Sequence, residues 1–171
     1  MKKLWLLGLG LSLVLAGCSD SGSDKEASDN ASVNENLAGD LMDYYLNLTT
    51  TVNGVDIELN GYEEAMAGEE PPAGEELAEL KASAAASATA SAEAVEEIDI
   101  PKDLGEQKEA VENFKQTLSE SYTMKAEALS KEGEADLSAA EEKMNEAENQ
   151  IKAILEDAGL VSSSLISDLN G

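Results

Sequence analysis

Apolar residues recur at alternating three- and four-residue spacing in four separate segments of this chain, and that spacing limits its fold more than any other feature. The alternation places apolar side chains on one face of a helix, whereas a half-buried strand needs an apolar residue at every second position. The first segment keeps the pattern over eight positions: Leu41, Tyr45, Leu48, Val52, Val55, Leu59, Tyr62 and Met66. We therefore predict an all-α protein.

The middle of this first segment carries a competing signal. Asn53-Gly54 lies between runs of β-prone residues, which is the pattern of a hairpin with a two-residue turn. An unbroken heptad over 41–66 outweighs one Asn-Gly pair, so we favour a continuous helix that Pro71-Pro72 ends. Ser32 and Glu35 fit a capping box ahead of this helix.

Three further segments predict three more helices. Residues 75–97 contain an Ala- and Ser-rich tract at 82–94, which is typical either of a low-complexity linker or of a helix that a neighbour approaches closely. We favour the helix because Leu, Val and Ile bracket the tract. The third helix has an apolar side made by Leu104, Val111, Phe114, Leu118, Tyr122 and Leu129. The fourth has one made by Leu137, Ala140, Met144, Ala147, Ile151, Ile154 and Ala158.

Four apolar stripes joined by short turns fold most simply as an antiparallel up-down-up-down four-helix bundle. We assign it to residues 37–171 as one acidic domain, with residues 160–169 as a short terminal helix. A second capping pattern, Asp103 with Glu106, precedes the third helix. Two outward-facing ion pairs at favourable four-residue spacing are predicted, Glu127 with Lys131 and Glu148 with Lys152.

The first residues of the chain have the organisation of an export signal. Lys2 and Lys3 precede an apolar stretch, Leu4 to Leu15, that is too short to be a comfortable membrane-spanning helix. The tetrapeptide Leu15-Ala16-Gly17-Cys18 follows, and it resembles the lipobox of bacterial lipoproteins. Residues 1–17 are therefore predicted to be a lipoprotein signal peptide.

That resemblance implies a specific modification. In lipoproteins the signal is cut in front of the cysteine, here between Gly17 and Cys18, and the cysteine sulfur receives a diacylglyceryl group. Two or more acyl chains hold a protein stably on a membrane that it does not span. Residues 18–36 hold Cys18 and a Ser-, Asp- and Asn-rich segment, which predicts a disordered, flexible stalk.

The charge balance excludes several functions. The chain has 36 Asp and Glu residues, 11 Lys, no Arg and no His, and its formal net charge is −25. Such a chain lacks the cations that drive nucleic-acid binding. Without His, and with one Cys, it cannot build a Ser-His-Asp or Cys-His catalytic unit or a histidine-containing metal site. We expect no cofactor and no enzymatic activity.

The remaining candidate sites have simpler explanations. Acidic clusters could hold Ca²⁺ or Mg²⁺, but none has the ligand order of an EF-hand, so we interpret them as solvated helix surface with weak divalent-cation binding at most. Methionines and tyrosines at helical spacing are interpreted as core residues rather than metal ligands or a ligand groove. The clusters are Glu63-Glu64, Glu69-Glu70, Glu75-Glu76 with Glu79, and Glu96-Glu97 with Asp99.

Together these features resemble small surface lipoproteins of Gram-positive bacteria. The leading hypothesis is a non-enzymatic lipoprotein, anchored to the membrane outside the cytoplasm, whose helical module has an interaction or structural role toward an envelope protein or the cell wall. The alternative is a lipoprotein that binds cations or a cationic ligand. An enzyme using carboxylates alone would need two of them across a cleft, which a narrow bundle rarely offers.

Overall fold

The computed structural model describes residues 24–170, and all regular structure in this range is helical. The all-α prediction is confirmed, since these residues contain no strand. The helices are α1 (Asp24–Asn53), α2 (Ile57–Ala67), α3 (Gly74–Glu97), α4 (Lys108–Leu129), α5 (Ser138–Asp157) and α6 (Leu165–Leu169), with a 3-10 turn, η1 (Gly105–Gln107), before α4.

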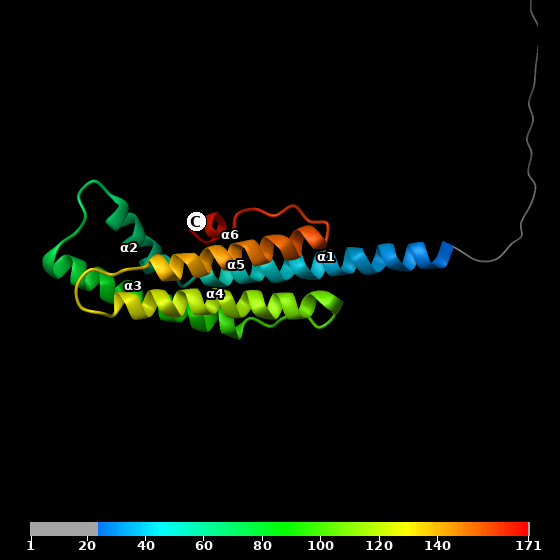
Figure 1. Ribbon diagram of the computed structural model, residues 1–171, viewed down its shortest axis with the longest axis horizontal. Helices are drawn as coiled ribbons and strands as arrows, with labels where there is room; N and C mark the ends of the chain where they lie inside the picture. The colour runs from blue at the N-terminus through cyan, green and yellow to red at the C-terminus, as the bar shows by residue number, and fades with distance from the viewer. Residues whose placement is uncertain (1–23, 171) are drawn as a thin grey trace, which may run out of the picture.

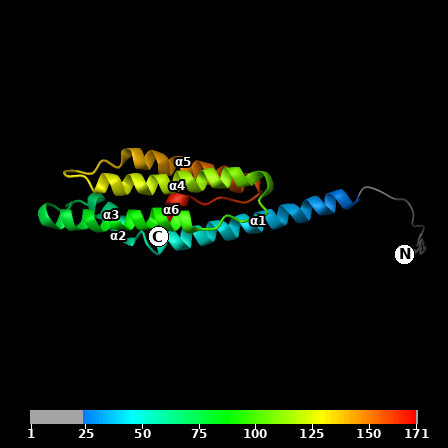
Figure 2. The ribbon, with the colours of Figure 1, turned by 90° about the horizontal axis from the view of Figure 1, so that it is seen from below.

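The long helices of the described region lie side by side along one direction (Figures 1 and 2). Followed along the chain, α1, α3, α4 and α5 alternate in direction. α4 is the central element because it packs along both α3 and α5, while α2 packs on α3. The short α6 contacts α1 and α5, so the C-terminal end of the chain returns to the first helix.

The continuous helix predicted over 41–66 is wrong, and so is the hairpin alternative. The chain breaks between Asn53 and Ile57, and α2 leaves the line of α1 (Figure 1). Gly54 is a poor helix former, and the turn allows Leu59 and Tyr62 to pack into the core instead of continuing along α1. Val55, which the heptad places in the seam, is 37% exposed.

Ser87 of α3 bridges this break. Its hydroxyl donates a hydrogen bond to the Val55 carbonyl at 2.7 Å and accepts one from the Leu59 N–H at 3.3 Å. Backbone groups at a helix start or end have no partner within their own helix. One buried hydroxyl therefore satisfies a carbonyl before α2 and an N–H inside its first turn.

The start of α1 also differs from the prediction. The helix begins at Asp24, so Ser32 and Glu35 lie inside it and not at its N-terminus, where the prediction placed them. Residues 24–36, predicted to be part of a disordered stalk, are helical and extend past the packed helices (Figures 1 and 2). Residues 18–23 of that predicted stalk lie outside the described residues.

The later helices follow the sequence pattern closely. α3 and α5 agree with their predicted ranges to within one residue at each end. Gly133 and Gly159 follow α4 and α5 with φ of 86° and 79°, a left-handed conformation that glycine adopts without steric cost. The capping pattern of Asp103 and Glu106 is not realised, since neither η1 nor α4 has a side-chain cap at its start.

The Ala-rich tract packs as a helix, which excludes the linker alternative. Ala84, Ala88 and Ser91 of α3 are fully buried, and their small side chains allow α4 to approach closely. Larger side chains of α4, among them Phe114 and Leu118, are fully buried in the same core. The apolar stripes of the long helices and of α2 meet in one core.

Two lysines join α3 and α4 at opposite ends. Lys81 of α3 donates from Nζ to the carbonyls of Lys131 and Gly133, at 2.9 and 2.6 Å, just beyond the end of α4. Lys115 of α4 donates to the carbonyls of Glu96 and Ile98, at 2.8 and 2.6 Å, at the end of α3. A cation at a helix C-terminus satisfies carbonyls that lack a helical partner and opposes the helix dipole.

The C-terminal helix ties α1, α2 and α5 together. Tyr45 of α1 donates from its hydroxyl to Asp168 at 2.6 Å, and Asn53 donates to the Asp168 carbonyl at 2.8 Å. Glu148 of α5 accepts hydrogen bonds from the Ser164 hydroxyl and the Ile166 N–H, at 3.1 and 3.2 Å. The terminal helix predicted within 160–169 is therefore present and joins separate parts of the bundle.

The two predicted surface ion pairs are not among those formed in the described region. Lys152 pairs with Glu156 at 3.9 Å, because Glu148 is engaged with α6. No contact within ion-pair distance joins Glu127 to Lys131 there. Both lysines are exposed, and an exposed pair of this kind contributes only about 0.3–0.5 kcal/mol, so the fold does not depend on them.

We predict that Lys81→Met destabilises the protein by about 2 kcal/mol, because two partly buried, charge-assisted hydrogen bonds are lost while much of the side chain's packing is kept. Urea unfolding of the variant and the wild type measures the change. Lys152→Met is the control, and it should change the free energy of unfolding by less than about 0.5 kcal/mol. Equal effects of the two substitutions would contradict the role assigned to Lys81.

Two neighbouring tyrosines provide a matched pair. Tyr45→Phe should cost about 1 kcal/mol because it removes the hydrogen bond to Asp168. Tyr44 is equally buried, but its hydroxyl has no partner among the described residues, so Tyr44→Phe should be neutral or stabilising. Thermal unfolding distinguishes the two variants. A similar loss of stability in both would show that α6 does not hold α1 through Asp168.

Candidate functional site

The predicted lipidation site lies outside the described residues. Cys18 and the cleavage position after Gly17 both precede Asp24, where the description begins. No helix of the described region combines the length and the apolar content that crossing a membrane requires.

The acidic clusters do not assemble into a metal centre in the described region. No three potential ligands of the His, Cys, Asp or Glu type come together there. Glu63 instead forms an ion pair with Lys125, and Glu96 accepts a hydrogen bond from Ser119 at 3.0 Å. Met144 is buried in the core, as its spacing predicts.

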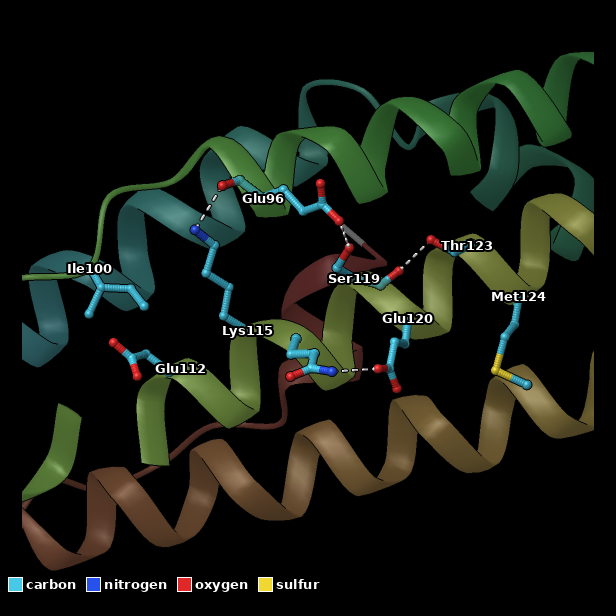
Figure 3. Close-up of a pocket in the computed structure, with 9 residues that line it drawn as sticks. Glu96, Ile100, Glu112, Lys115, Ser119, Glu120, Thr123 and Met124 are labelled. Carbon is cyan, nitrogen blue, oxygen red and sulfur yellow. Dashed lines mark hydrogen bonds between the residues drawn. The ribbon is translucent and has the colours of Figure 1, made fainter. Parts of the chain in front are cut away.

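A shallow groove of about 680 Å³ runs along the outer side of α3 and α4 (Figure 3). Three of its polar side chains, those of Glu96, Lys115 and Ser119, form hydrogen bonds between the two helices. Lys115 reaches across to the Glu96 carbonyl, and Ser119 donates to the Glu96 carboxylate, as the dashed lines show. Met124 and Ile100 give the groove apolar patches. The groove offers a surface for contact.

A smaller hollow of about 240 Å³ lies where α2, α4, α5 and α6 meet, and we call it the α2–α6 cavity. Four separate elements supply its walls, so it exists only in the folded chain. The residues that line it are Asn60 and Glu63 of α2, Tyr122 and Lys125 of α4, Glu141, Met144 and Asn145 of α5, and Ile166, Leu169 and Asn170 at the C-terminal end.

A charged cluster forms one side of this cavity. Lys125, 7% exposed, donates to Glu63 Oε1 at 2.6 Å and lies 6.0 Å from the centre of the Tyr122 ring. At that distance the ammonium is attracted to the face of the ring. Because Lys125 is almost buried, its charge needs the Glu63 carboxylate beside it.

Asp56 belongs to the same cluster. It is 2% exposed, and its Oδ2 atom is buried without a hydrogen-bond partner. Burial raises the pKa of this carboxyl to about 6, although the nearby Lys125 opposes the rise and Glu63 adds to it. Asp56 in turn contributes, after burial, to a raised pKa of the Tyr122 hydroxyl.

This arrangement can bind a small polar or charged molecule. The chain contains no histidine, and the described residues of the cavity include no Ser, Thr or Cys that could act as a nucleophile. Its carboxylates are either paired with Lys125 or exposed at the rim. Binding is therefore the chemistry that the geometry supports.

No family model, curated protein or solved structure matches the chain. Its function is therefore inferred from its own residues and their arrangement.

Sequence analysis missed this cluster, although a signal for it was present. Lys125 occupies a position of the apolar stripe between Tyr122 and Leu129, and Lys81 lies between Leu77 and Ala84 in the same way. A lysine within an apolar stripe indicates a buried cation that needs a partner. The pattern does not reveal which partner, because Glu63 is 62 residues away from Lys125 along the chain.

We predict that Asp56→Asn stabilises the protein at neutral pH. The pKa of Asp56 is higher in the folded chain, about 6, than its ordinary value of 3.8. The folded chain prefers the protonated carboxyl. The contribution of Asp56 to the free energy of unfolding is therefore fully present below about pH 4 and is lost as the pH rises through 6. The variant should exceed the wild type by about 1–2 kcal/mol at pH 7.5 and match it at pH 4.

Urea unfolding at several pH values measures this difference. Asp43→Asn, which changes an exposed carboxylate of α1, is the control and should show no such trend. A difference between Asp56→Asn and the wild type that stays constant from pH 4 to pH 7.5 would contradict the raised pKa.

Proposed function

We propose that the protein is a lipid-anchored, extracytoplasmic lipoprotein whose helical domain acts as a non-enzymatic interaction or structural module. The observation that carries this proposal is the tetrapeptide Leu15-Ala16-Gly17-Cys18 behind a basic and apolar leader. Cleavage after Gly17 leaves Cys18 as the new N-terminus, and acyl chains on it hold the domain at the membrane surface.

The direction of α1 supports this arrangement. The helix begins at Asp24, six positions after Cys18, and its first residues extend past the other helices (Figure 2). A helix of 30 residues is about 45 Å long. With the anchor at this end, α1 holds the packed helices away from the lipid headgroups. Separation also reduces repulsion between an anionic surface and a chain of net charge −25.

The module itself is proposed to work as an up-down-up-down four-helix bundle made by α1, α3, α4 and α5, with α2 and α6 as additions. Such a bundle presents long helix faces, and the groove of α3 and α4 is one of the hollows on them. A protein of the envelope or a cell-wall component is the kind of partner that this location offers.

A second candidate function is binding of a cationic ligand. The α2–α6 cavity favours it, because carboxylates outnumber ammonium groups around that hollow. The described residues hold no metal-type cluster, so a molecule with a cationic group fits this candidate better than a caged divalent ion.

Labelling with palmitate tests the anchoring. Cells that express the wild-type chain should incorporate labelled palmitate into it, and the protein should partition into the detergent phase. Cys18→Ala should abolish both, because Cys18 is the sole cysteine. Ser21→Ala is the matched control near the same site and should be labelled normally. Equal labelling of Cys18→Ala and wild type would refute the proposal.

A further inference from the structure

The α2–α6 cavity has an apolar side as well as a charged one. Met144, Ile166 and Leu169 line it, and Met144 and Leu169 are almost completely buried. Lys125 and Glu63 line it as well. A hollow of about 240 Å³ with both kinds of wall matches a small molecule that carries one charged group and a short hydrocarbon part.

The amides of the cavity offer hydrogen-bond acceptors. Asn60 already uses its NH₂ group to donate to the Leu169 carbonyl at 3.0 Å. Asn145 uses its NH₂ group in the same way, toward the Glu141 carbonyl at 2.8 Å. Each amide is thereby oriented so that the oxygen is the group left for a ligand. With the carboxylates of Glu63 and Glu141, the cavity presents acceptors from two sides.

The charge around the cavity also favours a cationic ligand. Two carboxylates, those of Glu63 and Glu141, line the cavity with one ammonium group, that of Lys125, and the Asp56 carboxyl lies close to Lys125 and Glu63. A ligand carboxylate or phosphate would meet this excess of negative charge in a partly desolvated site. A cationic hydrogen-bond donor would reduce this negative charge and could donate to the amide oxygens of Asn60 and Asn145.

We propose that the α2–α6 cavity binds a small primary ammonium compound with an apolar tail. The ammonium group donates to Glu63 and to the oxygens of Asn60 and Asn145, and the tail packs against Met144 and Leu169. This inference rests on the second candidate function and does not depend on the lipid anchor.

The probe for this proposal is n-pentylammonium, with pentanoate and 1-pentanol as molecules of similar size that carry a negative charge or none. The full chain is purified in detergent micelles with ¹³C-labelled methionine methyl groups, in 0.15 M NaCl to screen unspecific attraction. Pentylammonium should shift the Met144 methyl signal with a dissociation constant of about 1 mM, and should leave that of Met124, in the groove of α3 and α4, in place.

A pair of charge reversals locates the site. Glu141→Lys, at the exposed rim of the cavity, should weaken pentylammonium binding by about tenfold. Glu112→Lys, equally exposed but in the groove of α3 and α4, changes the net charge by the same amount and should leave the affinity unchanged within about twofold. Circular dichroism checks that both variants keep the wild-type helix content.

Three results would overturn the proposal. They are equal binding of pentanoate or pentanol, an equal loss of affinity in Glu112→Lys and Glu141→Lys, and no shift of the Met144 signal at 20-fold the expected dissociation constant. None of these bears on palmitate labelling, so a failure of this inference and a failure of the lipid anchor are distinguished by separate experiments.

Discussion

The scarcity of positively charged residues determines how the ends of α3 and α4 are stabilised. The chain has 11 lysines against 36 acidic residues, and none of the described helices has a basic residue in its last turn. The carbonyls at the ends of α3 and α4 therefore take their cation from the neighbouring helix. Lys115 caps α3, and Lys81 reaches the turn beyond α4, so the two helices are fixed at both ends in an antiparallel pair. The small residues of α3 then let this pair pack closely, and α5 and α2 add to it.

The break before α2 creates the cavity. A straight continuation of α1 would carry Asn60 and Glu63 away from α4, whereas the turn at Gly54 lays α2 on α3 and brings Glu63 to Lys125. The terminal helix α6 then covers the junction and is held there by Tyr45 and Glu148. One short stretch of poor helix formers thus determines both the path of the chain and the position of the α2–α6 cavity. The same stretch contains Asp56, whose buried carboxyl is a cost that the fold carries at neutral pH.

The helices that are defined by apolar spacing and by glycines in the following turns could be predicted from the sequence. The range of α3, the stripe of α5 and the stops at Gly133 and Gly159 follow from spacing and backbone freedom. The heptad through Val55 failed because the stabilising partner of the break, Ser87, lies on another helix. The cavity could not be predicted for the same reason, since its residues come from segments up to 110 positions apart and no local pattern pairs Asn60 with Asn170. The lipid anchor, in contrast, is a purely local signal and is proposed from sequence alone.

The proposed lipid anchor and the α2–α6 cavity both fit the proposal of a binding role outside the membrane. We infer that the pair of α3 and α4, held at both ends by Lys81 and Lys115, forms the part of the core on which the other helices pack. Native-state hydrogen exchange tests that claim most directly. The amides of α3 and α4 should exchange only through global unfolding, while those of residues 24–36 and of α6 exchange through smaller openings at lower free energy. Exchange of α3 or α4 amides at the same low free energy as those of α6 would contradict it.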